Sequence, residues 1–367
     1  MKTAHMFHHN DWDGKMSAAV MYQYFREARP DVENYRFYEV DYTLDLGNDV
    51  KADFNQGDVI VFTDYSFSKD SNVTWLLGLI THNRYEILWI DHHKSSVELC
   101  NKPVSIYGVE YSCMENLDAD YNIKVVVDTS YCATWLVWCY CYSMIKDAIP
   151  YDSIVPRLIK YVNSHDTFKH DMPNTDECHY GFMGYRYTPK TIFKKIFNGK
   201  SALSVFSNDK ESLDAMDKFI NKMISSGTAI KKYVDHRNEI ERDFAGFRFT
   251  ITDRVRCRVY SCYAMNIHSN SQAFGPLYEM YDIVCPFIFV GGKQWKYSLF
   301  SSKKDVDCSV IAKALGDIDG LGGGGHAGAA GFQTYDCILS EGCEVIINSS
   351  FFKKKTKVYI MEKGVEL

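Results

Sequence analysis

The sequence predicts an α/β protein in which a mostly parallel sheet is joined by a helical linker to a smaller α/β domain. Three observations predict this class. Short apolar strands alternate with helical patterns through the first half of the chain, which is typical of βαβ units. A strongly charged helical stretch comes next. Beyond it, apolar and polar residues alternate with the period of two that indicates β-strands.

In the first half, strands and helices are expected to follow one another closely. A short apolar strand opens the chain, and the helix after it stops at Pro30 because proline cannot continue a helix. Short apolar runs predict the later strands, and longer periodic runs predict the later helices. The expected strands are Ala4–His8, Tyr35–Val40, Val59–Phe62, Tyr85–Ile90 and Ile123–Val127. The expected helices are Lys15–Arg29, Val73–Ile80, Tyr131–Ile145 and Ile154–Asn163.

The remaining chain divides into a linker and a second domain. Asp209–Phe244 has a charged helical pattern interrupted only by Gly227, which indicates a pair of linker helices. Phe247–Val259 alternates as two strands of a hairpin would, with the turn near Asp253. We therefore predict a first domain at 1–205, a helical linker at 206–245 and a second α/β domain at 246–367.

The composition indicates a globular protein that stays in the cytoplasm. Hydrophobic residues make up 46% and charged residues 24% of the 367 residues, as in ordinary globular domains. No apolar run approaches the roughly 18 residues of a membrane span, and the first residues show no signal-peptide pattern. The twelve cysteines are scattered without a CxxC pair, which favours buried reduced thiols over disulfides.

The net charge of −6 restricts the ligands that the chain can bind. A protein that grips long nucleic acids through many phosphates usually carries a surplus of lysine and arginine. This chain has 41 basic and 47 acidic residues. The balance therefore favours a small phosphate-bearing ligand over a long duplex.

Acidic residues and histidines follow three of the predicted strands, and one further acid follows a predicted helix. In an open parallel sheet, ligands bind beyond the carboxyl ends of the strands, so these residues should converge. That much negative charge would be strongly repulsive without cations. Mixed imidazole and carboxylate ligands suit Mn²⁺, Fe²⁺, Co²⁺ or Zn²⁺ better than Ca²⁺. The clusters are His9–Asp13, Asp64, Asp91–His93 and Asp166.

An alternative is that each cluster only caps the helix after it. Asp11 and Asp13 would then cap the first helix, and Asp64 and Asp91 would cap the helices that follow them. A cap explains any one cluster well. It explains three clusters at corresponding strand ends less well than a shared metal site does.

A glycine run near the C-terminus is the second candidate site. Gly323, Gly324 and Gly325 precede His326, and three alanines and two more glycines follow before Phe332. Glycines let backbone N–H groups approach a phosphate closely, and His326 could donate a hydrogen bond to it. The alternative is a structural turn, although a histidine in such a setting is poorly explained as a core residue.

Together these motifs resemble those of the DHH family of phosphoesterases. His9–Gly14 matches HxDxDG, Asp64 matches an isolated aspartate after a strand, and Asp91–His93 matches the DHH motif itself. The stretch 323–332 matches the GGGHxxAAGF signature of the DHH-associated domain. The resemblance spans about residues 1–345, with the motifs in the order that the family shows.

The resemblance implies two divalent metal ions, with Mn²⁺ as the first choice and Mg²⁺, Co²⁺ or Fe²⁺ as other candidates. It implies that Asp64 and His93 are catalytic, with His93 facing the reacting phosphate. His8 and His165, which neighbour these residues, are expected in supporting or core roles. The implied ligands are His9 and Asp11 for one ion, Asp13, His92 and Asp166 for the other, and Asp64 as the bridge. The implied substrate-binding residues are Gly323, Gly324, Gly325 and His326.

The chain departs from the family at one position. Many relatives have a Ser-x-Arg-Ser pattern upstream of the glycine run, and Phe300 stands where that arginine would be. A phenylalanine cannot bind phosphate, but it can stack on a base, at about 1–3 kcal/mol. Lys303 or Lys304 could replace the lost cation. So could the arginines at 254, 256 and 258, unless they form a solvated strand face.

These inferences predict a metal-dependent phosphodiesterase of the nanoRNase type, with short oligonucleotides or dinucleotides clamped between two domains. A cyclic dinucleotide phosphodiesterase, a RecJ-like single-strand exonuclease and a catalytically inactive nucleotide-binding protein remain alternatives. A family II pyrophosphatase is a disfavoured alternative, because that family lacks the GGGHxxAAGF signature. The substrate, the cleavage polarity and the physiological metal stay open, as does the oligomeric state, for which a homodimer is one option.

Overall fold

The computed structural model describes residues 2–197, 203–291, 294–348 and 357–361. It contains two compact units, Met1–Lys231 and Lys232–Leu367. The division falls inside the long helix α9 (Lys210–Ala245), which gives residues to both units. The two units are described separately below. The predicted domain limits at 205 and 245 remain predictions.

The first unit is built on a five-stranded sheet with the order β2-β1-β3-β4-β7. All four neighbouring pairs run parallel, which confirms the predicted α/β class. The central strand β3 is buried along its whole length, as expected of a strand covered on both faces. The strands are β1 (Lys2–His9), β2 (Val32–Val40), β3 (Val59–Thr63), β4 (Glu86–Asp91) and β7 (Ile123–Val127).

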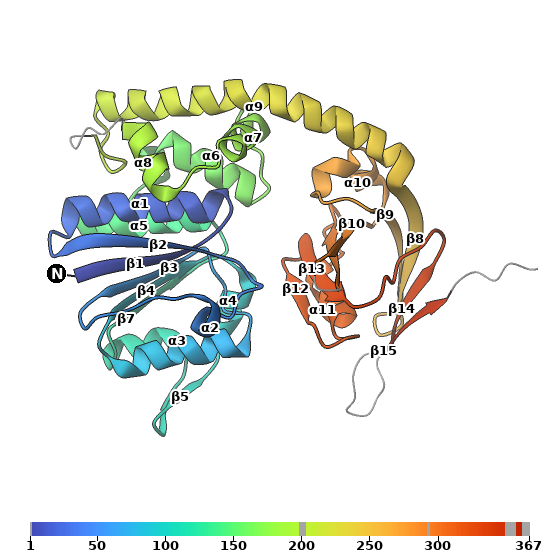
Figure 1. Ribbon diagram of the computed structural model, residues 1–367, viewed down its shortest axis with the longest axis horizontal. Coiled ribbons are helices and arrows are strands. Elements are labelled where there is room, and N and C mark those ends of the chain that lie inside the picture. Colours follow the sequence, from blue (N-terminus) through green and yellow to red (C-terminus); the bar gives the residue numbers. More distant parts are fainter. Residues whose placement is uncertain (1, 198–202, 292–293, 349–356, 362–367) are drawn as a thin grey trace, which may run out of the picture. The chain divides into compact units, whose positions relative to one another are not determined.

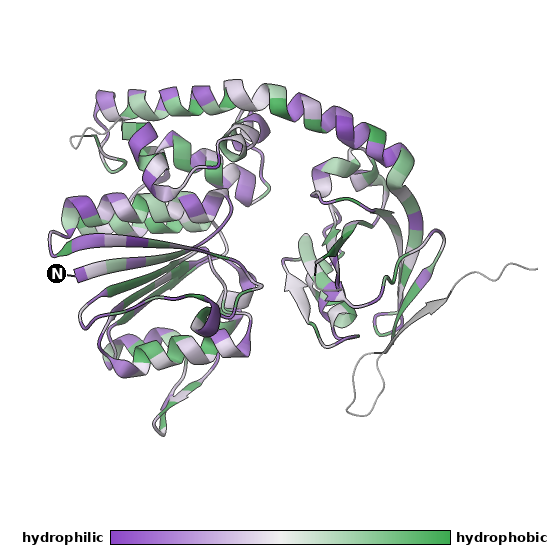
Figure 2. Cartoon of the chain, in the orientation of Figure 1, coloured by the Kyte–Doolittle hydropathy of each residue, from purple (hydrophilic) through white to green (hydrophobic). Residues whose placement is uncertain are grey.

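Helices cover both faces of this sheet (Figure 1). On one face α1 and α5 pack over a core that includes Val61 and Ile90. On the other, α3 packs over Phe62 and Trp89. Figure 2 shows hydrophobic residues concentrated in the strands between these layers. The helices are α1 (Trp12–Ala28), α2 (Leu46–Asp49), α3 (Asp70–His82), α4 (Lys94–Cys100), α5 (Ala133–Lys146), α6 (Arg157–Asp166), α7 (Thr175–Gly184) and α8 (Pro189–Phe197). A small hairpin, β5 (Val104–Ile106) and β6 (Val109–Tyr111), and the short 3-10 helices η1 (Met114–Ala119) and η2 (Asp152–Ile154) complete the unit.

The register of the strands brings their carboxyl ends to one edge. His8 of β1 pairs with Thr63 of β3, and Thr63 pairs with Ile90 of β4. His9 pairs with Val40, the last residue of β2. Residues that directly follow these strands therefore start from neighbouring points, which is the geometry that the sequence analysis assumed.

The second unit contains an eight-stranded mixed sheet with the order β12-β13-β11-β10-β9-β8-β14-β15. Helix α11 (Cys308–Gly316) packs on it through Ile311, Ala312 and Leu315, which confirms a second α/β unit. The strands are β8 (Gly246–Asp253), β9 (Arg258–Met265), β10 (Ile283–Val290), β11 (Gln294–Phe300), β12 (Gly323–Gly325), β13 (Ala329–Thr334), β14 (Glu344–Asn348) and β15 (Lys357–Met361). Two short helices, η3 (Ser271–Phe274) and α10 (Leu277–Met280), lie between β9 and β10.

The hairpin predicted near Asp253 is confirmed. The prediction that Arg254, Arg256 and Arg258 all lie on its second strand is wrong. Strand β8 ends at Asp253 and β9 begins at Arg258, so Arg254 and Arg256 lie in the turn. Asp253 accepts hydrogen bonds from two backbone N–H groups of this turn, which hold it closed. Arg256 is bound to Asp253 at 2.6 Å and Arg258 to Asp305 at 2.8 Å.

All twelve cysteines are free thiols, and eight of them are buried, as the scattered pattern predicted. In the part of the chain that the structure describes, no helix combines the length and the apolarity needed to cross a lipid bilayer.

Helix α9 is a single helix of 36 residues, so the predicted pair of linker helices is wrong. Gly227 does not interrupt it. A Cβ built on Gly227 would lie 1.7 Å from the Glu177 carbonyl oxygen of α7, and one on Gly181 would lie 1.9 Å from the Met223 carbonyl oxygen of α9. The two glycines therefore allow α7 and α9 to pack backbone against backbone. Gly227, which in the sequence suggests the end of a helix, is instead required for the packing of α9 against α7.

Gly227→Ala should destabilise the first unit by about 2–3 kcal/mol, because the added methyl group has to displace backbone. Gly78→Ala is the matched control. Gly78 also lies within a helix, but nothing is within 4 Å of its built Cβ, so alanine should add up to about 1 kcal/mol of helix stability. Urea denaturation followed by tryptophan fluorescence reports mainly on the first unit, which holds every tryptophan except Trp295. Equal effects of the two substitutions would contradict the close packing.

Candidate metal centre

His9 and Asp11 form one side of the candidate site. His9 is the last residue of β1, and Asp11 precedes α1. Nδ1 of His9 lies 2.7 Å from Oδ2 of Asp11. The other carboxylate oxygen of Asp11 accepts the Gly14 N–H at 2.9 Å and so caps α1. Asp11 therefore caps α1 with one oxygen and is placed as a candidate metal ligand with the other. The helix-cap and metal-ligand interpretations of this residue are compatible.

Asp64 lies at the centre of the site, directly after β3. Its backbone has a φ of 55°, in the left-handed region that aspartate tolerates better than most residues. Its N–H donates to the Ile90 carbonyl oxygen of β4 at 3.0 Å, which fixes this turn. One carboxylate oxygen lies 3.8 Å from Nδ1 of His9, and the other lies 3.3 Å from Nε2 of His92. Asp64 therefore reaches both halves of the site and does not cap α3.

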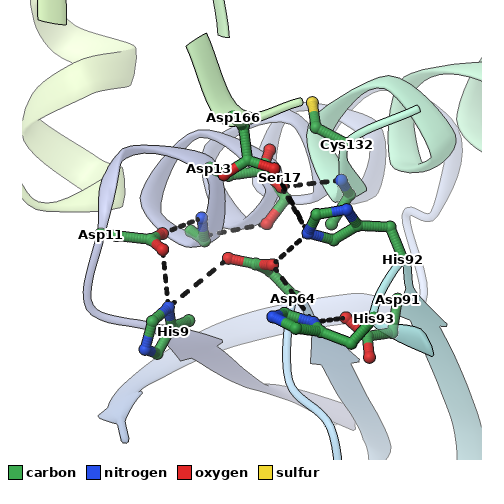
Figure 3. A network of polar contacts seen from close by, with 12 residues as sticks. His9, Asp11, Asp13, Ser17, Asp64, Asp91, His92, His93, Cys132 and Asp166 are labelled. Carbon is green, nitrogen blue, oxygen red and sulfur yellow. Dashed lines mark hydrogen bonds and ion pairs between the residues drawn. The ribbon is translucent and has the colours of Figure 1, made fainter. Parts of the chain in front are cut away.

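Asp13, His92 and Asp166 form the other side (Figure 3). Nε2 of His92 lies 3.3 Å from Oδ2 of Asp166 and 3.9 Å from Oδ2 of Asp13. Asp166, predicted to lie just past a helix, is the last residue of α6. Three different elements thus bring these side chains together: the first turn of α1, the end of β4 and the end of α6.

The candidate ligand atoms fall into three overlapping groups, and within each group all atoms lie within 4.8 Å of one another. Two of the groups match the two ligand sets that the resemblance implied, with Asp64 beside the first ion. The third places Asp64 together with His92, which is consistent with a bridging carboxylate. The groups are His9–Asp11–Asp64, Asp13–His92–Asp166 and Asp64–His92–His93.

The electrostatics of these groups fit divalent cations. Burial raises the pKa of Asp64 well above its usual value, and the neighbouring carboxylates of Asp11 and Asp13 raise it further. Burial and Asp13 raise the pKa of Asp166 to about 8. One carboxylate oxygen of each residue is buried without a hydrogen-bond partner in the protein. Buried carboxylate oxygens that accept no hydrogen bond and repel one another are stabilised by metal ions.

The histidines respond to the same negative charge. Burial alone would lower the pKa of His9, but the neighbouring carboxylates, above all Asp11, together outweigh burial and raise it. For His92, burial is likewise outweighed, mainly by Asp166 and Asp13, and its pKa is raised. Burial opposes ionisation of Asp11, yet His9 and the Gly14 N–H hold its pKa below the usual value.

Helix α5 holds Asp13 in place, which the sequence analysis missed. The N–H groups of Ala133 and Thr134 donate to the two carboxylate oxygens of Asp13 at 2.7 and 2.8 Å, and the Thr134 hydroxyl donates to its carbonyl oxygen at 2.9 Å. The free N–H groups and the dipole of the α5 N-terminus therefore stabilise this carboxylate. Asp13 and Thr134 are 121 positions apart, so no local pattern could have shown the contact.

His93 is held at both ring nitrogens. Its Nδ1 lies 2.8 Å from Oδ1 of Asp91, and its Nε2 lies 3.1 Å from the Tyr42 hydroxyl. The Ser96 hydroxyl donates to the other oxygen of Asp91. The sequence analysis missed Tyr42, although it follows β2 at the same edge of the sheet as the other clusters.

The two neighbouring histidines lie outside the ligand groups. His8 is buried, and its Nδ1 contacts the His9 carbonyl oxygen at 2.8 Å. The ring of His165 stacks on that of His179, with centroids 3.7 Å apart. Burial lowers the pKa of both His8 and His165. These placements agree with the supporting or core roles expected for them.

In the second unit, the glycine run forms the strand β12 and a tight turn into β13. The turn is closed by the His326 N–H, which donates to the Ala329 carbonyl oxygen at 2.7 Å. Internal packing by itself requires two of the glycines. Gly325 has a φ of 143°, and a Cβ on Gly323 would lie 2.2 Å from the Ala312 carbonyl oxygen of α11. Gly324 is exposed, with nothing within 4 Å of a built Cβ.

Phe300 and Lys303 lie next to this turn. Phe300 pairs with Ala329 in the sheet, and its partly buried ring packs against a small apolar cluster that includes Phe274. Nζ of Lys303 donates to the Glu279 carbonyl oxygen at 2.6 Å. The substrate-binding roles of the glycine run, Phe300 and Lys303 stay predictions.

No family model matches the chain, and no curated protein is similar to it in sequence. Among solved structures, it is similar to a DHH domain from a protein described as a member of a family of ribosomal proteins, with 10% identity over 90% of this chain and 82% of that chain and a TM-score of 0.49. RecJ from Thermus thermophilus in complex with Mn²⁺ matches with 11% identity over 90% of this chain and a TM-score of 0.42, and the match covers 49% of RecJ. CDC45 from Entamoeba histolytica matches with 9% identity over 91% of this chain and 92% of that chain and a TM-score of 0.41. None of these likenesses establishes a function, which is argued below from the site itself.

Proposed function

We propose that this chain is a DHH-type phosphoesterase that hydrolyses phosphodiester bonds with the aid of two divalent cations. The observation that carries the proposal is the convergence of the motif residues. Side chains from four separate places in the sequence form two ligand groups around Asp64, and one buried carboxylate oxygen of Asp64 and one of Asp166 make no hydrogen bond within the protein.

The residues of the site have different proposed roles. His9 and Asp11 would hold one cation, Asp13, His92 and Asp166 the other, and Asp64 both. Such a cation pair lowers the pKa of a bound water and stabilises the charge of the attacking and leaving oxygens. The ring of His93, held by Asp91 and Tyr42, would face the reacting phosphate. The mixture of imidazole nitrogen and carboxylate oxygen suits Mn²⁺, Fe²⁺ or Co²⁺, and Mn²⁺ is the first choice because of the resemblance to DHH phosphoesterases.

We further propose that the substrates are short, namely oligonucleotides of a few residues or dinucleotides. The net charge is −6, and several cations that could form a track for a longer strand are engaged within the second unit. Arg256 and Arg258 are paired with aspartates. The Lys303 ammonium group is bound to a backbone carbonyl oxygen. Each further nucleotide would bring a phosphate that such a surface does not attract.

The length of the substrate tests this proposal directly. With Mn²⁺ present, kcat/KM for single-stranded RNA and DNA should be highest at two to four nucleotides and should fall well before twenty. Cyclic dinucleotides and pyrophosphate complete the panel. A rise of kcat/KM with length, together with a steep loss on adding salt, would show a polymer substrate and favour the exonuclease alternative. Inactivity on every phosphodiester would contradict the proposed function.

Asp64→Asn should stabilise the metal-free protein at pH 8 but not at pH 5. A carboxyl group whose pKa is raised by folding contributes stability below its unfolded pKa and loses it as the pH rises through the folded value. The neutral amide avoids this loss, so the free energy of unfolding of the variant should exceed that of the wild type at pH 8.

Urea denaturation in a chelator measures this difference. With Mn²⁺ added, the order should reverse, because the wild type gains binding free energy that the variant lacks. Elemental analysis should find two ions in the wild type and fewer in Asp64→Asn. Full occupancy of both ions in the variant would contradict the bridging role.

His326→Ala should leave the metal content unchanged and lower kcat/KM by about 2–3 kcal/mol in transition-state free energy, as expected for a lost phosphate contact. The matched control is His268→Ala, since His268 is an exposed histidine of the same unit. Both variants should melt close to the wild type. If the two variants have the same kinetics, the glycine run is a structural turn only.

A further inference from the structure

Tyr42 occupies a place in the site that no sequence motif indicates. It lies two residues after β2, and its ring is between the rings of His9 and His93, with centroid distances of 5.2 and 5.9 Å. It stacks on Tyr65 at 5.5 Å, with the two rings nearly parallel at 14°. Strand β2 thus contributes a side chain to the same edge at which β1, β3 and β4 place the candidate ligands.

The fold holds Tyr42 through contacts outside the candidate ligands. Nδ2 of Asn72 in α3 donates to the Tyr65 hydroxyl at 3.0 Å and to the Leu44 carbonyl oxygen at 3.1 Å. The same side chain accepts the Leu46 N–H at 2.8 Å. Asn72 is buried. It fixes both the loop after Tyr42 and the ring of Tyr65, on which Tyr42 stacks. The position of Tyr42 is therefore set by α3 and does not need metal ions.

Tyr42 completes a chain of hydrogen bonds. Ser96 donates to Asp91, Asp91 contacts Nδ1 of His93 at 2.8 Å, and Nε2 of His93 contacts the Tyr42 hydroxyl at 3.1 Å. An imidazole held at Nδ1 alone can swing about that bond, whereas one held at both nitrogens has a single orientation. A phenol hydroxyl both donates and accepts, so it can hold Nε2 whichever protonation state the ring has.

We propose that Tyr42 is a positioning residue that fixes the orientation of the His93 imidazole through its hydroxyl group, so that His93 meets the reacting phosphate in a defined geometry. This inference rests on the proposed function for its catalytic part, because it assumes that His93 faces a phosphate. Tyr42 acts through His93 and needs no contact of its own with the substrate.

The test removes only the hydroxyl group. Tyr42→Phe should lower kcat about tenfold, with KM within twofold and with metal content and melting temperature unchanged, because the ring still stacks on Tyr65. The matched control is Tyr38→Phe. The Tyr38 hydroxyl also contacts a histidine, at 3.0 Å from Nδ1 of His5, but neither residue belongs to the ligand groups. This control should keep the wild-type kcat.

A double-mutant cycle separates positioning from a direct role. In a His93→Gln background, Tyr42→Phe should change kcat less than twofold, because the ring that it orients is gone. A tenfold loss in that background as well would show that Tyr42 acts on the substrate or the metals and would overturn the inference. So would a kcat of Tyr42→Phe equal to that of Tyr38→Phe.

A readout independent of activity is available in the metal-free protein. With ¹⁵N-labelled histidine, the imidazole resonances missing from His93→Gln identify His93. Tyr42→Phe should shift its Nε2 resonance and leave its Nδ1 resonance in place, whereas Tyr38→Phe should change only His5. An unshifted Nε2 would overturn the contact itself. If the wild type hydrolyses no phosphodiester while this shift is present, the proposed function fails and the hydrogen bond between Tyr42 and His93 stands.

Discussion

Mutual repulsion among closely spaced carboxylates at the edge of the first sheet is the constraint on which the candidate site depends. Burial and the charges of Asp11, Asp13 and Asp166 raise the pKa of Asp64, and burial and Asp13 raise that of Asp166. Asp64 is almost fully buried. Burying like charges together is unfavourable unless cations or hydrogen-bond donors compensate. The groups around each carboxylate compensate part of this repulsion. The repulsion that is left uncompensated would favour the binding of metal ions.

The carboxylates differ in how much of this repulsion is compensated by hydrogen-bond donors of the fold. The N-terminus of α1 donates to Asp11, and the N-terminus of α5 donates twice to Asp13. Asp91 is turned to His93 and Ser96. Asp64 and Asp166 each keep one buried oxygen that accepts no hydrogen bond in the protein. The two acids that the protein leaves least compensated are thus those expected to bridge the ions and to complete the second ligand set.

The second unit shows that part of the glycine motif is required by the packing of the fold. Gly323 and Gly325 are needed for the packing of β12 against α11 and for the turn at 326–328. Gly324, by contrast, is exposed and under no such demand. Three of the five cations considered from the sequence are engaged in the fold, Arg256 and Arg258 by aspartates and Lys303 by a carbonyl oxygen. A short substrate is consistent with a surface on which these charges are already paired.

The sequence by itself determined the alternation of strands and helices, the hairpin at Asp253 and the set of acids and histidines at the strand ends. These follow from local patterns, since the apolar runs indicate where each strand ends and parallel strands end at the same edge of a sheet. Only the tertiary structure decided the rest. Gly227 packs against α7 instead of ending a helix, α5 holds Asp13 across 121 positions, and Tyr42 meets His93. Each of these contacts joins residues far apart in the chain, and a local pattern carries no information about which distant backbone or hydroxyl group will be its neighbour.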